Sequence, residues 1–235
     1  MEGLILAAGL GTRLRPLTDD RPKALVEVAG EPLLALAISR MAAAGVIHIV
    51  VNVHHFANQV EAYINSHRWP CPISISDERT LLLDTGGALK HAQNLFSGQD
   101  DILVHNVDVL STIDLAALQE QHTTQRNLAT LCCSRRTTQR LLAFDAEGCL
   151  LGRANELPLF SSYKSLAFSG IALVNPNLLP LLPEADHPYS IIDQYIALAS
   201  THAVRCHIHR ADQWLDVGRP ETLQKAQSWN LSFNK

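Results

Sequence analysis

The chain has 235 residues, of which 47% are hydrophobic and 18% charged, a composition typical of a folded globular protein rather than a disordered one. Its 19 Lys and Arg against 23 Asp and Glu give a net charge of −4, which argues against a dedicated binder of nucleic acid or of an anionic membrane. No apolar run reaches the roughly 18 residues that a membrane-spanning helix needs. The acidic Glu2 and a short apolar run do not match a secretory signal.

The cysteines and histidines indicate no structural metal or disulfide framework. Five cysteines form no CxxC pair, so we expect reduced, mostly buried thiols in a cytoplasmic protein. His207 and His209 would share one face of a strand, but their spacing matches no common zinc site. We therefore expect a polar strand edge there.

Short apolar runs alternate with helical patterns in the first half, as in βαβ units with a mostly parallel sheet. The expected strands are 3–8, 48–53, 73–76 and 102–105, and the expected helices are 33–44, 57–67 and 87–96. The second half favours strands at 128–133, 141–144, 149–151 and 166–174, a loop at 157–165, and helices at 191–200 and from Pro220. Ser190 is a plausible helix N-cap, and Glu147-Gly148 a hairpin turn. The prediction is a single α/β domain, 1–235, with a Rossmann-like, mostly parallel central sheet flanked by helices and a small antiparallel flap in its second half.

The segment 4–23 contains the strongest chemical signal. An apolar strand leads into Gly9 and Gly11, where the backbone can approach a ligand closely and its N–H groups can bind an anion. Cations outnumber acids in the residues that follow, with Arg13, Arg15, Arg21 and Lys23 against Asp19 and Asp20. A glycine-rich turn with a cationic excess is suited to the phosphates of a nucleoside triphosphate.

Two other phosphate-binding motifs do not match this segment. The dinucleotide motif GxGxxG would need a glycine at Leu14, and no Gly-Lys-Ser/Thr follows the turn as in a Walker A motif. The first mismatch disfavours a dinucleotide-dependent redox enzyme. A plain tight turn with exposed arginines remains the alternative interpretation of the segment taken alone.

The same residues resemble the signature GxGTR…PK of the sugar-1-phosphate nucleotidyltransferases, through Gly9, Gly11, Thr12, Arg13, Pro22 and Lys23. The resemblance implies that the loop wraps the nucleotide, with Leu6, Ala7, Ala8, Gly9, Gly11, Thr12 and Arg13 as binding residues. It also implies catalytic roles for two cations. Arg13 would bind the triphosphate, and Lys23 would contact the phosphates near the reacting centre.

Two later segments resemble the family's second nucleotide loop and its metal site. Gly86 and Gly87, in 84–89, would lie against the base and ribose. The strand 102–108 ends in Asp108, which would bind Mg²⁺, with Val107 where the family usually has a small residue. The W-x-D-x-G pattern at 214–218 would supply Asp216 as the second metal ligand.

The sugar-binding residues are implied by position in the same way. The segment 168–171 resembles the family's sugar-side strand, in which Gly170 would allow close approach of the pyranose. Asn106 neighbours the metal aspartate, and Glu156, with Arg153, precedes the sugar-side strand. We therefore predict a nucleotide-binding half at about 1–110 and a sugar-binding half at about 111–235.

The resemblance implies Mg²⁺-dependent transfer of a nucleotidyl group from a nucleoside triphosphate, UTP or GTP, to a sugar 1-phosphate. Among subfamilies the chain looks most like N-acetylmuramate-1-phosphate uridylyltransferases, while mannose- and heptose-1-phosphate guanylyltransferases share most of these features. A non-catalytic sensor of nucleotide sugars is the alternative from another class. We expect neither a nucleic acid nor a membrane as partner, and the oligomeric state stays open.

Overall fold

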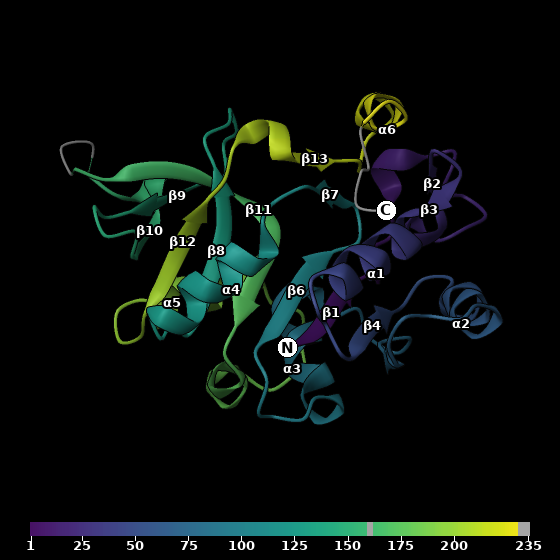
Figure 1. The fold of residues 1–235 in the computed structure, drawn as a ribbon, viewed down its shortest axis with the longest axis horizontal. Coiled ribbons are helices and arrows are strands. Elements are labelled where there is room, and N and C mark those ends of the chain that lie inside the picture. Colours follow the sequence, from purple (N-terminus) through teal and green to yellow (C-terminus); the bar gives the residue numbers. More distant parts are fainter. Residues whose placement is uncertain (159–161, 230–235) are drawn as a thin grey trace.

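The computed structural model describes residues 1–158 and 162–229, and its core is one large mixed sheet with helices on both faces (Figure 1). The strands of this sheet are β1 Glu2–Leu6, β4 Ile49–Val53, β5 Ile73–Asp77, β6 Ile102–Asn106, β8 Ala129–Ser134, β9 Leu141–Phe144, β10 Leu150–Arg153, β11 Lys164–Val174 and β12 Val204–Ile208. The helices are α1 Leu33–Ala43, α2 Ala57–Ser66, α3 Asp84–His91, α4 Leu115–Thr124, α5 Ile191–Leu198 and α6 Pro220–Ala226. Two small antiparallel sheets pair β2 Glu27–Val28 with β3 Glu31–Pro32, and β7 Val109–Ser111 with β13 Trp214–Asp216.

The sheet is parallel where the first half of the chain forms it and antiparallel where β11 joins. Its strand order is β10-β9-β11-β6-β1-β4-β5, and β8 pairs with both β11 and β12. The central strand β1 is parallel to β4 and to β6, and β4 is parallel to β5. The carboxyl ends of these four strands therefore lie along one edge, where open α/β sheets bind ligands.

Alternating side chains of the central strands divide the core into two clusters. Ile5 belongs to the cluster that also contains residues of α1, α2, α4 and α6, whereas Leu4 belongs to the cluster with residues of α3 and α5. Val50 and Val51 divide in the same way. A strand buried on both faces must be apolar at successive positions, which is why these segments are continuous apolar runs.

The predicted α/β class, a mostly parallel central sheet flanked by helices with a smaller antiparallel part in the second half, is confirmed. The antiparallel strands β9 and β10 continue the main sheet and are joined through a turn in which Gly148 has a φ of 83°. Ser190 is the N-cap of α5, and its Oγ accepts a hydrogen bond from the amide of Ile192. The division into a nucleotide-binding and a sugar-binding half stays a prediction.

Several boundaries differ from those expected. The helix predicted at 87–96 begins three residues earlier as α3 and continues into a 3-10 turn, Ala92–Leu95. β11 begins at Lys164, inside the loop predicted at 157–165, of which residues 159–161 lie outside the described part of the chain. No element was predicted for α4, β7 or β13, and the last two contribute to the site described below.

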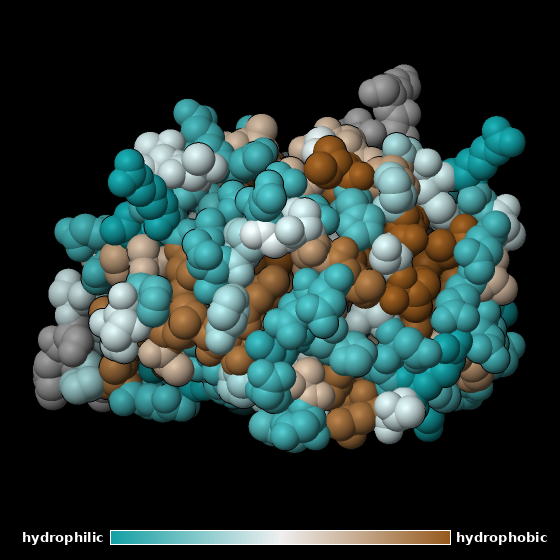
Figure 2. All heavy atoms as spheres, turned by 90° about the horizontal axis from the view of Figure 1, so that it is seen from below, coloured by the Kyte–Doolittle hydropathy of each residue, from teal (hydrophilic) through white to brown (hydrophobic). Residues whose placement is uncertain are grey.

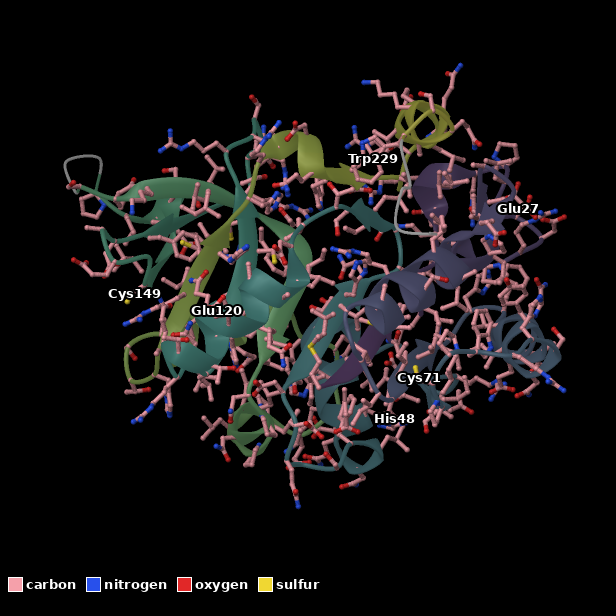
Figure 3. The ribbon with its side chains drawn as sticks, in the orientation of Figure 1. Glu27, His48, Cys71, Glu120, Cys149 and Trp229 are labelled. Atoms are coloured by element: carbon pink, nitrogen blue, oxygen red, sulfur yellow. The ribbon has the colours of Figure 1, made fainter. Side chains whose placement is uncertain are left out.

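One face of the molecule mixes hydrophilic and apolar side chains (Figure 2), and the cysteines are unpaired. The face drawn in Figure 2 carries apolar patches separated by hydrophilic side chains. Among residues 1–158 and 162–229, no helix combines the length and apolar composition needed to cross a bilayer. All five cysteines are free thiols, and Cys71 and Cys149 lie far apart in Figure 3.

Candidate active site

The buried side-chain amide of Asn52 holds the glycine turn after β1 through hydrogen bonds. Asn52, near the end of β4, is 3% exposed, and its Oδ1 accepts hydrogen bonds from the backbone amides of Ala7 at 2.6 Å and Ala8 at 3.2 Å. Its Nδ2 donates to Glu78 Oε1 at 2.7 Å, and Glu78 Oε2 accepts from the Leu83 amide at 3.1 Å. Burial raises the pKa of the Glu78 carboxyl, an effect that these two hydrogen bonds oppose. The network joins the carboxyl ends of three strands to the segment before α3.

The chain then folds back so that Gly11 of this turn lies beside Lys23. Gly11 has a φ of 65°, and its carbonyl oxygen accepts a hydrogen bond from Thr18 Oγ1 at 2.8 Å. A Cβ on Gly11 would lie 3.1 Å from the Cβ of Lys23. The loop after β1 and the segment that carries Lys23 are thus in contact.

Lys23 and Asp108 form the central ion pair of the site. Lys23 Nζ donates to Asp108 Oδ2, and both side chains are largely buried, with 12% and 13% exposed. Asp108 lies between β6 and β7, and the pairing of β7 with β13 sets Asp216 opposite Val109. The amide of Val217 also donates to the Asp108 carbonyl oxygen at 2.9 Å.

Gly218 marks the point at which the charged groups meet. A Cβ on Gly218 would lie 2.7 Å from Asp216 Oδ1, 2.8 Å from Arg13 Nη2 and 3.0 Å from Asp108 Oδ2. Asp216 Oδ1 also accepts a hydrogen bond from the Gly218 amide at 2.7 Å. Three side chains that the sequence places far apart therefore surround one small volume, which only a glycine leaves open.

A cavity of about 540 Å³ opens beside this ion pair. The predicted site residues among those that line it are Leu6, Ala8, Gly9, Lys23, Asn106 and Asp108. Asn52, Glu78 and Thr85 also line it. This volume is within the range of small-molecule sites, and its walls combine apolar side chains with a few fixed polar groups.

The second glycine pair lies at the start of α3, against the chain before α5. The Gly86 amide donates to the Tyr189 carbonyl oxygen at 2.9 Å, and a Cβ on Gly86 would lie 2.5 Å from the Tyr189 ring. A Cβ on Gly87 would lie 2.9 Å from the Cβ of Leu83. In the structure these glycines make close contacts within the protein, while neighbouring Thr85 lines the cavity.

Two of the three predicted sugar-binding residues are brought together. A Cβ on Gly170 would lie 2.7 Å from Asn106 Nδ2, and Asn106 lines the cavity. Glu156 is placed elsewhere: its exposed carboxylate lies 3.7 Å from Arg153, which also pairs with Asp193 of α5. A role for Glu156 in sugar binding stays a prediction.

Sequence reasoning missed Asn52 and Glu78. A polar residue inside the apolar run Ile49–Val53 was the available signal for Asn52, because a buried amide must find hydrogen-bond partners. Glu78 directly follows β5 and is 1% exposed, and no local sequence feature distinguishes it from a surface glutamate.

The donor set suits Mg²⁺ held jointly with a substrate. Mg²⁺ prefers oxygen ligands and is usually bound through one or two carboxylates together with phosphate oxygens. Asp108 and Asp216 direct carboxylate oxygens to the same point, beside Gly218. Among the described residues no group of three or more His, Cys, Asp or Glu could form a cage made of protein alone. The two carboxylates therefore fit a shared metal site.

A cationic turn after the first strand, paired carboxylates and a cavity at the carboxyl edge of parallel strands are suited to an α/β enzyme with a phosphate-rich nucleotide as ligand. The family model described as "Nucleotidyl transferase" matches residues 2–231, so the chain belongs to this family. The chain is therefore an enzyme of the nucleotidyltransferase class, and its fold is that of the sugar-1-phosphate nucleotidyltransferases.

Individual relatives match over nearly their whole length. The chain is 35% identical to the N-acetylmuramate α-1-phosphate uridylyltransferase of Caulobacter vibrioides, over 96% of this chain and 95% of that one. It is 32% identical to the protein of the same name from Neisseria meningitidis, over 97% of each. The solved UDP-glucose pyrophosphorylase of Acinetobacter baumanii has the same fold, with a TM-score of 0.81 at 18% identity over 96% of this chain and 91% of that one.

Proposed function

We propose that this chain transfers the uridylyl group of UTP to N-acetylmuramate α-1-phosphate and releases pyrophosphate, with Mg²⁺ as cofactor, in the cytoplasm. The observation that carries the substrate assignment is the end-to-end similarity to two proteins named for this reaction. Guanylyl transfer to mannose or heptose 1-phosphate is the alternative within the same class.

The reaction requires charge neutralisation and alignment more than covalent help from the protein. An oxygen of the sugar phosphate attacks the α-phosphorus of the nucleotide, and the bond to the bridging oxygen of the β-phosphate breaks as pyrophosphate leaves. The attacking oxygen is already ionised near neutral pH, so no general base is needed. Holding the two anions in line supplies much of the acceleration.

Each charged residue has a distinct role in this proposal. Lys23 contacts the α-phosphate, where charge changes during the reaction, and Arg13 binds the phosphates that leave as pyrophosphate. Asp108 and Asp216 would hold Mg²⁺, which when bound supplies the positive charge that offsets the repulsion between the two anionic substrates. The convergence of Arg13, Asp108 and Asp216 at Gly218 supports these assignments.

The nucleotide would bind to residues of the first half of the chain, and the sugar where the first half meets the second. The cavity beside Gly9 and Lys23 would take the nucleotide, whose base and ribose lie toward α3. The contact between Asn106 and Gly170 would form the floor of the sugar site.

A matrix of pyrophosphate release tests the proposal. UTP, GTP, CTP, ATP and dTTP are each combined with the 1-phosphates of N-acetylmuramate, mannose, heptose and glucose, with and without Mg²⁺. The highest kcat/KM is expected for UTP with N-acetylmuramate α-1-phosphate, and only with Mg²⁺. A maximum for GTP with mannose or heptose 1-phosphate would replace the substrate assignment. Tight binding of a nucleotide sugar without turnover of any pair would favour the sensor alternative.

A further inference from the structure

The sugar side of the site is built on an irregularity in β11. Phe168 pairs with Cys133 and Ala172 with Leu131, so two extra residues of β11 bulge out of the ladder with β8. Gly170 lies in this bulge with a φ of 73°, a backbone conformation that residues other than glycine rarely adopt. The bulge brings Gly170 against the side chain of Asn106, on the wall of the cavity.

The guanidinium of Arg136 holds this bulge. Arg136 Nη1 donates to Ser169 Oγ at 2.8 Å and to Ser134 Oγ at 3.1 Å, and Nη2 donates to the carbonyl oxygen of Phe168. The Cζ of Arg136 lies 3.8 Å from the centre of the Trp214 ring. One planar cation thus joins the end of β8, the bulge in β11 and the first residue of β13.

Trp214 and His209 complete the hydrogen bonding of the bulge. Trp214 Nε1 donates to the Ser169 carbonyl oxygen at 2.7 Å. His209 Nδ1 lies 2.8 Å from the carbonyl oxygen of Arg210, which can only accept, so Nδ1 carries the proton of the neutral ring. His209 Nε2 therefore accepts from the Ser169 hydroxyl at 2.8 Å, and Ser169 Oγ is left to accept from Arg136.

These contacts connect the bulge with the metal site. Trp214 begins β13, and Asp216 ends it two residues later. The ring on which Arg136 stacks is therefore part of the short strand that positions one of the two carboxylates. The hydrogen bonds and the ring contact of Arg136 described above are made with residues of β8, of the bulge in β11 and of β13.

We infer that Arg136 is a positioning residue for the sugar 1-phosphate: by holding Ser169 and Trp214 it sets the distance between the Gly170–Asn106 contact and Asp216. This inference rests on the proposed function, because it requires the sugar to lie on this side of the reaction centre. Loss of Arg136 then weakens binding and alignment of the sugar phosphate more than binding of the nucleotide, because Asn52 holds the glycine turn.

Steady-state kinetics of three variants test the inference with Mg²⁺, UTP and the sugar 1-phosphate that the wild type uses best. Arg136→Gln removes the charge and the fork of donors, and Arg136→Lys keeps the charge without the planar fork. Arg135→Gln is the matched control, because Arg135 is exposed, adjacent, and loses the same charge. Both Arg136 variants are expected to raise the KM for the sugar 1-phosphate at least tenfold, with the KM for UTP within twofold. Arg135→Gln is expected to leave both values within twofold.

Equal changes in both KM values, or full rescue by Arg136→Lys, would overturn the inference. If Arg136 only stabilised the fold, its replacement would lower the melting temperature but would not change the KM for the sugar 1-phosphate more than the KM for UTP. If Arg136→Gln does not fold, Trp214→Phe carries the same test, because it keeps a ring under Arg136 and loses only the bond to Ser169.

Hydrogen–deuterium exchange separates failure of the inference from failure of the proposed function. An inactive wild type contradicts the proposed function whatever Arg136 does. Faster exchange over residues 166–174 in Arg136→Gln than in Arg135→Gln supports the holding contact independently of turnover. Unchanged exchange over those residues contradicts the inference even if the wild type is active.

Discussion

A single methyl group at Gly218 should disable the site with little effect on folding. The Cβ of Gly218→Ala would lie 2.7 Å, 2.8 Å and 3.0 Å from Asp216, Arg13 and Asp108, well inside the roughly 3.5–4.0 Å of ordinary contact. The three charged groups must therefore move apart by roughly 0.5–1 Å. Gly218 does not have a positive φ, so alanine can adopt the same backbone conformation. Alanine also keeps the amide that donates to Asp216.

A misplacement of this size costs about 10²-fold in rate, which corresponds to roughly 2.7 kcal/mol of transition-state stabilisation. The free energy of unfolding should change by only about 1 kcal/mol, or roughly 2–4 °C in melting temperature. The assay is the initial rate of pyrophosphate release at saturating substrates and Mg²⁺, with thermal unfolding measured on the same sample.

Gly98→Ala is the control for adding a methyl group to a glycine, because a Cβ there meets nothing within 4 Å and Gly98 lies outside the site. Gly98→Ala should retain wild-type turnover despite some backbone strain from its φ of 75°. If Gly218→Ala retained turnover within about threefold of the wild type, the reasoning that Arg13, Asp108 and Asp216 act together at this point would be refuted.

Three further changes probe separate parts of the account. Lys23→Ala should lower kcat by on the order of 10², since it removes the cation proposed for the reacting phosphate; unchanged turnover would make Lys23 structural only. Burial lowers the pKa of His105 from 6.5 to about 4, so between these pH values the unfolded chain binds a proton that the folded chain does not. The free energy of unfolding therefore falls by up to about 3 kcal/mol as the pH falls through this range. Urea unfolding at pH 7.5 and 4.5 should show a smaller loss for His105→Gln than for the wild type; equal losses would contradict that assignment. Ser190→Ala should cost about 1 kcal/mol in the same assay through loss of the α5 N-cap, and no measurable cost would show that the cap is dispensable.

The sequence predicted those parts of the fold whose signals are local. β4 and β6 are nearly continuous apolar runs because both of their faces are buried, and the start of α5 follows a capping serine. The glycine turn and Lys23 were found because backbone freedom and positive charge are both visible in a short segment.

Other parts depend on contacts between distant segments. The start of α3 was placed too late because two glycines disfavour a helix, whereas packing against Tyr189 requires a residue without a side chain at Gly86. α4 buries only a narrow stripe, Leu115, Leu118 and His122, which leaves a weak pattern in the sequence. Such features follow from the order of the strands, which no local pattern contains.

The residues of the candidate site likewise include some that the sequence predicts and others that depend on contacts between distant segments. Asp108 and Asp216 could be predicted as a pair only through the family resemblance, since 107 residues of chain separate them and the pairing of β7 with β13 joins them. Asn52 acts through Ala7 and Glu78, which directly follow the strands β1 and β5 on either side of β4. Arg136 acts through β11 and β13 and carries no motif of its own.

The fate of labelled phosphates tests the central claim most directly. The enzyme is incubated with Mg²⁺, the preferred sugar 1-phosphate, and UTP labelled with ³²P at either the α- or the γ-position. The α-label should appear in the nucleotide sugar and the γ-label in pyrophosphate, in equal amounts, and Asp216→Asn should form neither product. Transfer of the γ-label to the sugar, or full product formation by Asp216→Asn, would contradict that claim.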